Sequence, residues 1–466
     1  MSDLFGSLSI AVRSLLAQEG AINTTTNNIS NVNTPGYSRQ IPILTEAPPL
    51  DTGQISIGNG VNFEGVQSVR DNILELRIDQ ETQQQNQLHS YVNSMNQVQS
   101  LFNDAAGGGL GDVINQFFSS FQQLADNPTD VPTRQAVISA AQNLASTFQQ
   151  TGQQLSTIQG GLDQEVSQTV DEINSDTTQL AGLNQQISSL QSNTEQAGML
   201  EDQQYSVLNH LSQLVDVAVT DAGDGSLTIT TTNGVPLVAG AQSFALNTEA
   251  DPSTGFQDIF AQGTDVTSNF TGGQLAGLLE ARDQAIPSAL SNLDNLAAGI
   301  INAVNTQNEQ GYILNGEEVS QTKGGNIFQP VVQPAPGSNA GAAENMAVAI
   351  TDPSQIAASS DGTQGDNANA LAMAKIQNQA VVNGETATDF YSNLVSTVGN
   401  DVSSATDEQE AVGLVLTQLQ NQRSDISGVS LDEEAVNLIQ YQRAYEAAAD
   451  VVSSIDQLTN MVIQTF

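Results

Sequence analysis

The chain has 466 residues, with 51 acidic and 10 basic side chains and no cysteine. Its net charge of −41 argues against binding to nucleic acid or to an anionic membrane surface, because both need clustered cations. The lack of cysteine excludes disulfides, thiolate metal sites and cysteine nucleophiles. The length predicts two to four domains.

Two further classes of segment are missing from the sequence. No apolar run reaches the roughly 18 residues that a membrane span needs. The N-terminus lacks the basic and apolar blocks of a secretory signal peptide. We therefore expect no membrane span, and export by a route that uses no cleaved signal.

Large apolar residues recur at helical spacing at both ends of the chain. Steps of three and four place each set on one stripe of a helix and predict coiled-coil-like terminal helices. Burial of so few side chains does not offset the conformational entropy lost when a long helix is ordered. We therefore expect neighbouring subunits to supply the missing burial. The first stripe is Phe5, Leu8, Val12, Leu15, Ile22 and Ile29, and the second is Leu438, Tyr441, Tyr445, Ala448, Val452, Ile455, Val462 and Phe466.

The first helix must end before Pro35, and residues 37–69 read as extended or irregular. Helical spacing returns over residues 70–105 and again from Val113 to Leu124. A long helical arm follows Pro132 and continues to about residue 215, with Gly160-Gly161 as either a break or a tolerated kink.

Apolar and polar residues alternate from about residue 216, which predicts strands. Asn233-Gly234 predicts a hairpin with a type I′ turn, because both central positions of that turn need positive φ. One helix near 273–308 interrupts this region. Helix resumes over about 366–424, and Ser430 with Glu433 predicts a capping box at the start of the last helix.

The predicted fold class is mainly α with an inserted β domain. Residues 1–40 with 428–466 form a terminal coiled-coil unit. Residues 41–215 with 355–427 form a long-helix bundle, and residues 216–354 form an outer β-rich domain that includes the helix near 273–308. This nesting places the two chain ends close together.

Candidate catalytic groups are few. His89 and His210 lie in predicted helices at ordinary apolar spacing, and no nucleophile elbow or zinc motif occurs. Asp221 and Asp224 loosely resemble a calcium loop, but a β-turn explains them better. The carboxylates at 432–434 suit the positive end of a helix dipole. We predict no enzyme, with no catalytic, cofactor-binding or metal site.

Two segments resemble a known family. The run NNISNVNTPGYSR at residues 27–39 resembles the N-terminal signature of bacterial flagellar rod, hook and hook-associated proteins, the flagellar axial family. The run SGVSLDEEAVNLIQYQRAY at residues 427–445 resembles its C-terminal signature. Residues 124–137, 209–240 and 365–371 are similar to the hook-associated protein 1 group of that family, whereas about 241–350 resemble it poorly.

The resemblance implies a structural subunit of the hook–filament junction that assembles through its terminal helices. The implied partners are further copies in a ring, the hook protein, the filament-side hook-associated protein, a flagellar export chaperone and the type III export apparatus. The implied location is the extracellular flagellum. Alternatives are another axial subunit (hook, rod or filament-side junction protein), a secreted adhesin or a flagellar peptidoglycan hydrolase.

We expect the assembly interface to use both stripes and the loop between the first helix and the extended region. The chaperone is expected to bind part of the C-terminal stripe, namely Leu438, Tyr445, Val452 and Ile455. The expected interface residues are Phe5, Leu8, Val12, Leu15, Ile22, Ile29, Asn31, Asn33, Pro35, Gly36, Tyr37, Leu438, Tyr441, Tyr445, Val452, Ile455 and Val462.

Overall fold

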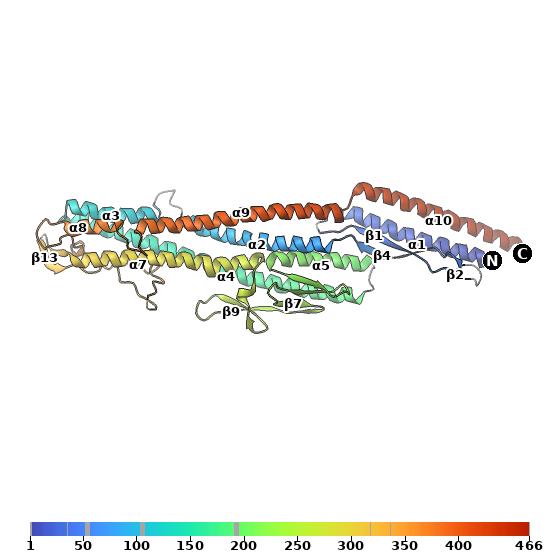
Figure 1. Ribbon diagram of the computed structural model, residues 1–466, viewed down its shortest axis with the longest axis horizontal. Helices are drawn as coiled ribbons and strands as arrows, with labels where there is room; N and C mark the ends of the chain where they lie inside the picture. Colours follow the sequence, from blue (N-terminus) through green and yellow to red (C-terminus); the bar gives the residue numbers. More distant parts are fainter. Residues whose placement is uncertain are drawn as a thin grey trace.

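The computed structural model describes residues 2–34, 36–51, 56–102, 108–190, 195–316, 318–335 and 337–465. The molecule is long and narrow, with a bundle of long helices at one end and a thinner terminal unit at the other (Figure 1). The predicted mainly α class with paired terminal helices is confirmed, and the β structure consists of small antiparallel sheets.

The bundle is built from helices that pack along its length. None of the helices in the described ranges is long and apolar enough to cross a membrane. Gly160 and Gly161 lie inside α4 and do not interrupt it. The helices are α2 (Asn72–Leu101), α3 (Leu110–Asp126), α4 (Val131–Ser189), α5 (Glu195–Leu214), α6 (Gly273–Glu280), α7 (Ile286–Gln310), α8 (Ala368–Lys375) and α9 (Ala387–Ser427), with a π-helical turn at Ala281–Ala285 and 3-10 helices at Thr267–Asn269, Pro353–Gln355 and Ile376–Asn378.

One continuous apolar core runs through the bundle. Its aromatic centre lies where α3 meets the segment after β13 (Glu318–Lys323), with the ring of Phe117 5.3 Å from Phe121 and 5.5 Å from Phe328. Phe121 lies three residues after Phe118 and four after Phe117, which brings the three rings to one side of α3. This burial holds α3 against α4 and α8.

The helical run from α6 to α7 lies among the bundle helices. Its α6 part packs against α2 and α4, and its α7 part packs against α4, α8 and α9. The helix expected near 273–308 therefore exists, and its apolar stripe is buried in the bundle core.

The sheets built from β5 to β11 lie along one side of α4, whereas β13 lies at the end of the bundle away from the terminal unit (Figure 1). The first has the order β5-β6-β7-β8 and the second the order β11-β10-β9, while β12 pairs with β13. Their bounds are β5 (Ala218–Asp221), β6 (Leu227–Thr230), β7 (Pro236–Ala239), β8 (Gln242–Ser243), β9 (Leu246–Ala250), β10 (Gln257–Ala261), β11 (Thr264–Asp265) and β12 (Tyr312–Asn315).

The turn between β6 and β7 differs from the prediction. A hairpin forms, but the type I′ assignment is wrong: Gly234 has φ +85°, whereas Asn233 is not among the residues with positive φ. The amide of Gly234 donates to the Thr231 carbonyl at 2.9 Å, and Thr231 and Val235 close the loop. The pairing of β6 with β7 shifts register between Ile229 and Thr230, which makes the loop longer than a two-residue turn. In this longer loop only the glycine adopts the left-handed conformation.

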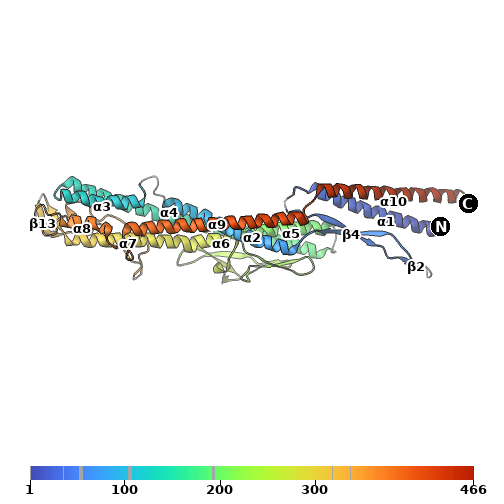
Figure 2. The ribbon, with the colours of Figure 1, turned by 45° about the horizontal axis from the view of Figure 1, so that its top comes forward.

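The terminal unit consists of α1 (Ser2–Ser30) and α10 (Leu431–Thr465), which pack along each other beyond the end of the bundle (Figure 2). Strands β1 (Gln40–Glu46) and β4 (Val61–Ser68) form a hairpin that also packs on α1, and β2 (Leu50–Asp51) pairs with β3 (Ser56–Ile57). A Cβ at Gly20 would lie 2.7 Å from the Phe63 ring, so this glycine permits the close approach of helix and hairpin.

Candidate functional site

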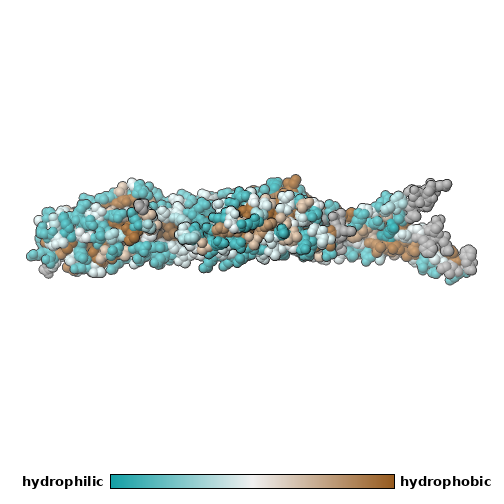
Figure 3. Space-filling view, turned by 90° about the horizontal axis from the view of Figure 1, so that it is seen from below, coloured by the Kyte–Doolittle hydropathy of each residue, from teal (hydrophilic) through white to brown (hydrophobic). Residues whose placement is uncertain are grey.

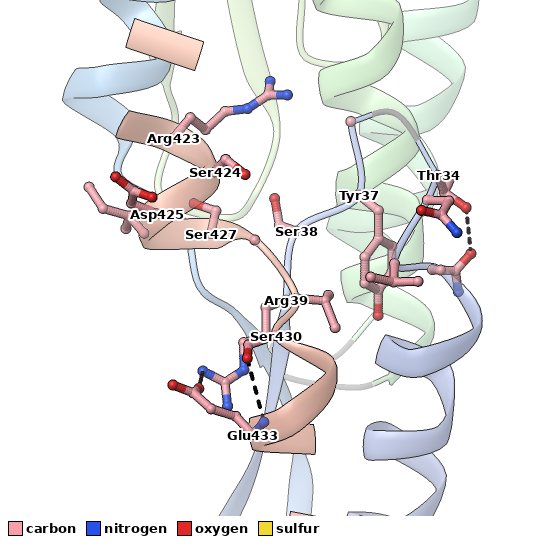
Figure 4. A pocket seen from close by; sticks show the side chains of 17 residues that line it. Thr34, Tyr37, Ser38, Arg39, Arg423, Ser424, Asp425, Ser427, Ser430 and Glu433 are labelled. Carbon is pink, nitrogen blue, oxygen red and sulfur yellow. Dashed lines mark hydrogen bonds and ion pairs between the residues drawn. The ribbon is translucent and has the colours of Figure 1, made fainter. Parts of the chain in front are cut away.

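Residues of the two terminal segments meet at one joint, where the terminal unit leaves the bundle. The loop after α1, residues 31–39, faces the turn between α9 and α10, and together they line a polar pocket (Figure 4). The backbone amide of Arg39 donates to the Ser427 carbonyl at 2.9 Å, and Val69 donates to the Arg39 carbonyl at 2.7 Å. The chain segment around Arg39 therefore ties the hairpin to the end of α9.

Asn28 is the buried centre of this joint. Its amide nitrogen donates to the Gln40 carbonyl at 2.8 Å and to Glu434 Oε2 at 3.0 Å. Its amide oxygen accepts from the Gln40 backbone at 2.9 Å and from the Tyr37 hydroxyl at 2.8 Å. All four hydrogen bonds that an asparagine side chain can make are thus used, which fixes the end of α1 relative to both β1 and α10.

Arg39 completes the joint through two carboxylates. Its Nε lies 2.8 Å from Glu434 Oε1, and its Nη1 lies 3.0 Å from Glu433 Oε2. The Glu434 side chain is only 2% exposed, whereas that of Glu433 is 62% exposed, so Arg39 and Glu434 depend on each other for charge compensation. The predicted capping box is formed on one side: Ser430 Oγ accepts the Glu433 amide at 3.5 Å, while the Glu433 carboxylate turns to Arg39.

A second arginine links the joint to the bundle. Arg70 lies 2.6 Å from Asp202 of α5, donates to Ser38 Oγ at 3.1 Å and stacks 3.8 Å from the Tyr205 ring centre. Burial raises the pKa of Asp202 to about 6, although Arg70 opposes this shift. With Arg423, which lies 3.7 Å from Glu75, three of the chain's few cations gather around this joint.

Asp79 of α2 is a buried carboxyl next to this joint. Burial raises its pKa from 3.8 to about 7, and the nearby charge of Glu75 adds to the shift. A hydrogen bond with Asn209 and the charge of Arg423 oppose it. The folded chain therefore holds a proton at Asp79 over a pH range in which an unfolded aspartate has lost it.

The predicted stripe of α1 is not the most buried face of that helix. The fully buried positions carry small or polar side chains, whereas the large predicted side chains Leu8, Leu15, Ile22 and Ile29 are half-buried and Val12 is exposed. The side chain of Phe5, together with Pro35, lies outside the described residues. The buried set is Ala11, Ala17, Ala21, Thr24, Thr25 and Asn28.

The stripe of α10 turns toward α1 along most of its length. Ile455 is buried, and Leu438, Tyr441 and Val452 are half-buried, whereas Tyr445 and Val462 are more exposed, at 38% and 37%. Further apolar side chains of α10 lie outside its buried face. These are Val436, Ile439, Val451 and Leu458, and all four are exposed.

The loop residues expected in the interface serve the joint itself. Asn31 donates to the Asn27 side chain at 2.8 Å and accepts from Thr34 at 3.1 Å. Tyr37 bonds to Asn28 as described above. Asn33 and Gly36 are exposed, and the φ of +79° at Gly36 favours glycine there.

The remaining candidate residues have structural roles. His210 Nδ1 lies 2.6 Å from Asp176, and His89 lies between Asn93 and Gln409. Asp221 and Asp224 accept from backbone amides two residues on, as the predicted turn requires. Over the described ranges, no group of acidic or histidine side chains is arranged to hold a metal ion.

Comparisons with known proteins agree with this architecture. Residues 95–328 match the family model described as the flagellar hook-associated protein FlgK helical domain. The chain is 28% identical to flagellar hook-associated protein 1 of Bacillus subtilis, over 99% of this chain and 98% of the relative. The chain belongs to the flagellar hook-associated protein FlgK family. The predicted resemblance is thereby confirmed, as is the prediction of a structural protein rather than an enzyme.

Further relatives and family models match other parts of this FlgK-family chain. Flagellar hook-associated protein 1 of Escherichia coli is 28% identical over 97% of this chain and 98% of its own length. The structure of the flagellar hook junction protein FlgK from Burkholderia pseudomallei has the same fold, with a TM-score of 0.66 and 20% identity over 75% of this chain and all of that one. Residues 8–37 match the model "Flagella basal body rod protein", and residues 420–465 match "Flagellar basal body rod FlgEFG protein C-terminal".

Sequence reasoning about this FlgK-family chain missed Asn28, Arg39 and Glu434 as the residues that form the joint. One available signal was composition, because a cation in a chain with 51 acidic and 10 basic residues is expected to have a specific partner. The partner itself could not be identified from sequence, since Arg39 and Glu434 are 395 residues apart.

Glu434→Gln should weaken the attachment of the terminal unit, because it leaves Arg39 without its buried counter-charge. We expect a loss of about 1.5–3 kcal/mol in local stability, seen as faster amide hydrogen exchange in α1 and α10 than in α4. Glu433→Gln removes the exposed partner and should cost less than about 1 kcal/mol. Equal effects of the two substitutions would contradict the assignment of Glu434 as the buried partner.

The raised pKa of Asp79 has a consequence for stability. Between about pH 4 and pH 7 the folded chain holds a proton that the unfolded chain releases, so this group makes stability fall as pH rises through that window. Asp79→Asn should lose this part of the slope in melting temperature, whereas Asp407→Asn, at an exposed position, should keep it. An unchanged slope in Asp79→Asn would refute the shifted pKa.

Proposed function

We propose that this chain forms the junction between the flagellar hook and filament, and that it joins the axis through α1 and α10. The observation that carries the proposal is the apolar surface of the terminal unit. Leu16 of α1 is 60% exposed and Val436 of α10 is 64% exposed. Figure 3 shows apolar residues at the surface of this unit among hydrophilic ones.

The packing inside the terminal unit supports this role. A self-sufficient pair of helices buries its large apolar side chains and exposes its small ones. Here the opposite holds for α1, where alanines and threonines are buried and leucines are left half-exposed or exposed. Further copies of the chain and adjoining axial subunits are the partners that complete this burial.

The proposed partners follow the direction of the axis. The hook protein lies on one side of a ring of copies, and the filament-side hook-associated protein lies on the other. The Burkholderia relative is named as a hook junction protein, which supports this position. The terminal matches to rod-protein models support a mode of assembly shared with other axial subunits. The interface uses both stripes together with Asn31, Asn33, Pro35, Gly36 and Tyr37.

The proposed domain arrangement follows from the same axis. The terminal unit, residues 1–40 with 428–466, faces the axis, and the bundle surrounds it. The β-rich segment 216–354 supplies the outermost part, namely the strands β5 to β11 on one side of α4, while its helical run from α6 to α7 packs within the bundle. The assembled protein is extracellular, in the flagellum, after export by the type III apparatus.

The export chaperone is proposed to bind α10 before export, at Leu438, Tyr445, Val452 and Ile455. Three of these side chains face α1 and are buried or half-buried there. The chaperone and α1 therefore compete for one face of α10, which keeps the terminal unit open until the chain leaves the cytoplasm.

Leu16→Asp tests the assembly surface. We expect the variant to lose binding to isolated hooks in a co-sedimentation assay, with the melting temperature unchanged because Leu16 contributes little to the folded monomer. Asn23→Asp, at an exposed position of the same helix, adds the same charge and should bind normally. Normal hook binding by Leu16→Asp would reject α1 as an assembly element.

Two neighbouring valines of α10 test the chaperone surface. Val452→Asp changes the face that contacts α1, whereas Val451→Asp places the same charge on the exposed side. Calorimetric titration with the export chaperone should show at least about tenfold weaker binding for Val452→Asp and near-normal binding for Val451→Asp. The reverse order of affinities would assign the chaperone to the other side of α10.

A further inference from the structure

We propose that neighbouring copies of this chain meet through two different surfaces of the bundle, one on α2 and one on α9. The α2 patch is Ile73, Leu76 and Arg77, and the α9 patch is Glu410 and Leu414. This inference rests on the proposed function, because it assumes that copies stand side by side around the flagellar axis. It adds the residues and the symmetry of their contact.

The α2 patch exposes large apolar side chains on a helix that buries others of the same kind. Leu74 and Ile78 of α2 are buried, and they pack with Leu419 of α9. Ile73 is nevertheless 74% exposed, and Leu76 and Arg77 are exposed beside it. Steps of three and four place these three side chains on one face of α2, turned away from α9.

The α9 patch has the complementary composition. Leu414 is 74% exposed, and Glu410 is exposed one turn before it. Val412 and Leu419, which are buried, lie on the other side of the helix. The patch therefore points away from α2, so the two patches lie on opposite sides of the α2–α9 pair.

The α9 patch lies farther along the bundle than the α2 patch. Glu75, beside the α2 patch, is level with Arg423 of α9 at 3.7 Å, and Leu414 precedes Arg423 by nine residues of the same helix, which is roughly 14 Å. A second copy in the same orientation, shifted along the bundle by about this distance, can therefore bring its α9 patch to the α2 patch of the first. Two different surfaces make a head-to-tail contact, which continues from copy to copy around the axis.

Electrostatic complementarity determines which patches of two copies can pair. Each copy carries a net charge of −41, so contacts between copies are repulsive unless a cation faces an acid. Arg77 is an exposed cation, and no ion pair involves it among the described residues. Two α2 patches together would oppose two arginines, and two α9 patches would oppose two glutamates. Only the pairing of α2 with α9 unites opposite charges around an apolar centre.

Cysteine cross-linking tests the contact, because the native chain has no cysteine. Full-length Ile73→Cys/Leu414→Cys, bound to isolated hooks and mildly oxidised, should give a ladder of covalent oligomers beyond the dimer. The two cysteines of one chain cannot join, since α2 and α9 lie between them. Neither single-cysteine variant should cross-link, whereas an equal mixture of the two should give dimers.

Each other outcome has a definite meaning. Dimers from Ile73→Cys alone would replace the head-to-tail contact by a symmetric one and overturn the inference. Hook-bound subunits that give no cross-link would overturn the inference and leave the proposed function standing. Failure of the cysteine-free parent chain to bind hooks would instead reject the proposed function.

Charge reversal provides a second measurement. Arg77→Glu and Glu410→Arg should each reduce the copies bound per hook by about tenfold or more at low salt, and the double variant should recover. Lys375→Glu makes the same change in charge as Arg77→Glu at an exposed position on α8 and should bind normally. Loss of binding in the double variant equal to that of the single variants would contradict the Arg77–Glu410 pairing.

Discussion

The constraint on which this structure depends is that α1 and α10 cannot bury their apolar surface within one chain. Each helix turns one face to the other, and β1 and β4 cover part of α1. Large side chains such as Leu16 and Ile439 nevertheless remain in contact with solvent. A long helix pair without a third apolar layer has too little core to be rigid, and this shortfall is what makes the terminal unit an assembly element.

The joint at Asn28, Arg39 and Glu434 fixes how the terminal unit is oriented relative to the bundle. A buried asparagine with all its hydrogen bonds made, and a buried carboxylate with its arginine, fix the direction in which the terminal unit leaves the bundle. Buried polar groups of this kind specify one arrangement over others, because every alternative leaves a charge or amide unpaired. The bundle can therefore be held at a defined angle to the axis even though α1 and α10 still expose apolar surface for partners.

The sequence predicted the helices well because their apolar periodicity is strong and local. Spacing identifies the terminal stripes but not their burial within the chain: Ile455 of α10 is buried, whereas α1 buries Ala17 and Ala21 more fully than its leucines. Periodicity shows which residues share a face but not which face meets which neighbour. The same limit applies to helix α7. Its apolar stripe could pack against a β-rich domain or within a bundle, and spacing alone does not distinguish the two. The Arg39–Glu434 pair links residues from opposite ends of the chain, and no local pattern identifies such a pair.

Amide hydrogen exchange of the full chain, measured free and bound to isolated hooks, tests the central claim most directly. The account predicts that α1 and α10 exchange much faster than α4 in the free chain and become protected when the chain joins a hook. Protection of α1 and α10 in the free chain equal to that of α4, with no change on binding, would contradict it. That result would mean that the terminal helices already have all the burial they need.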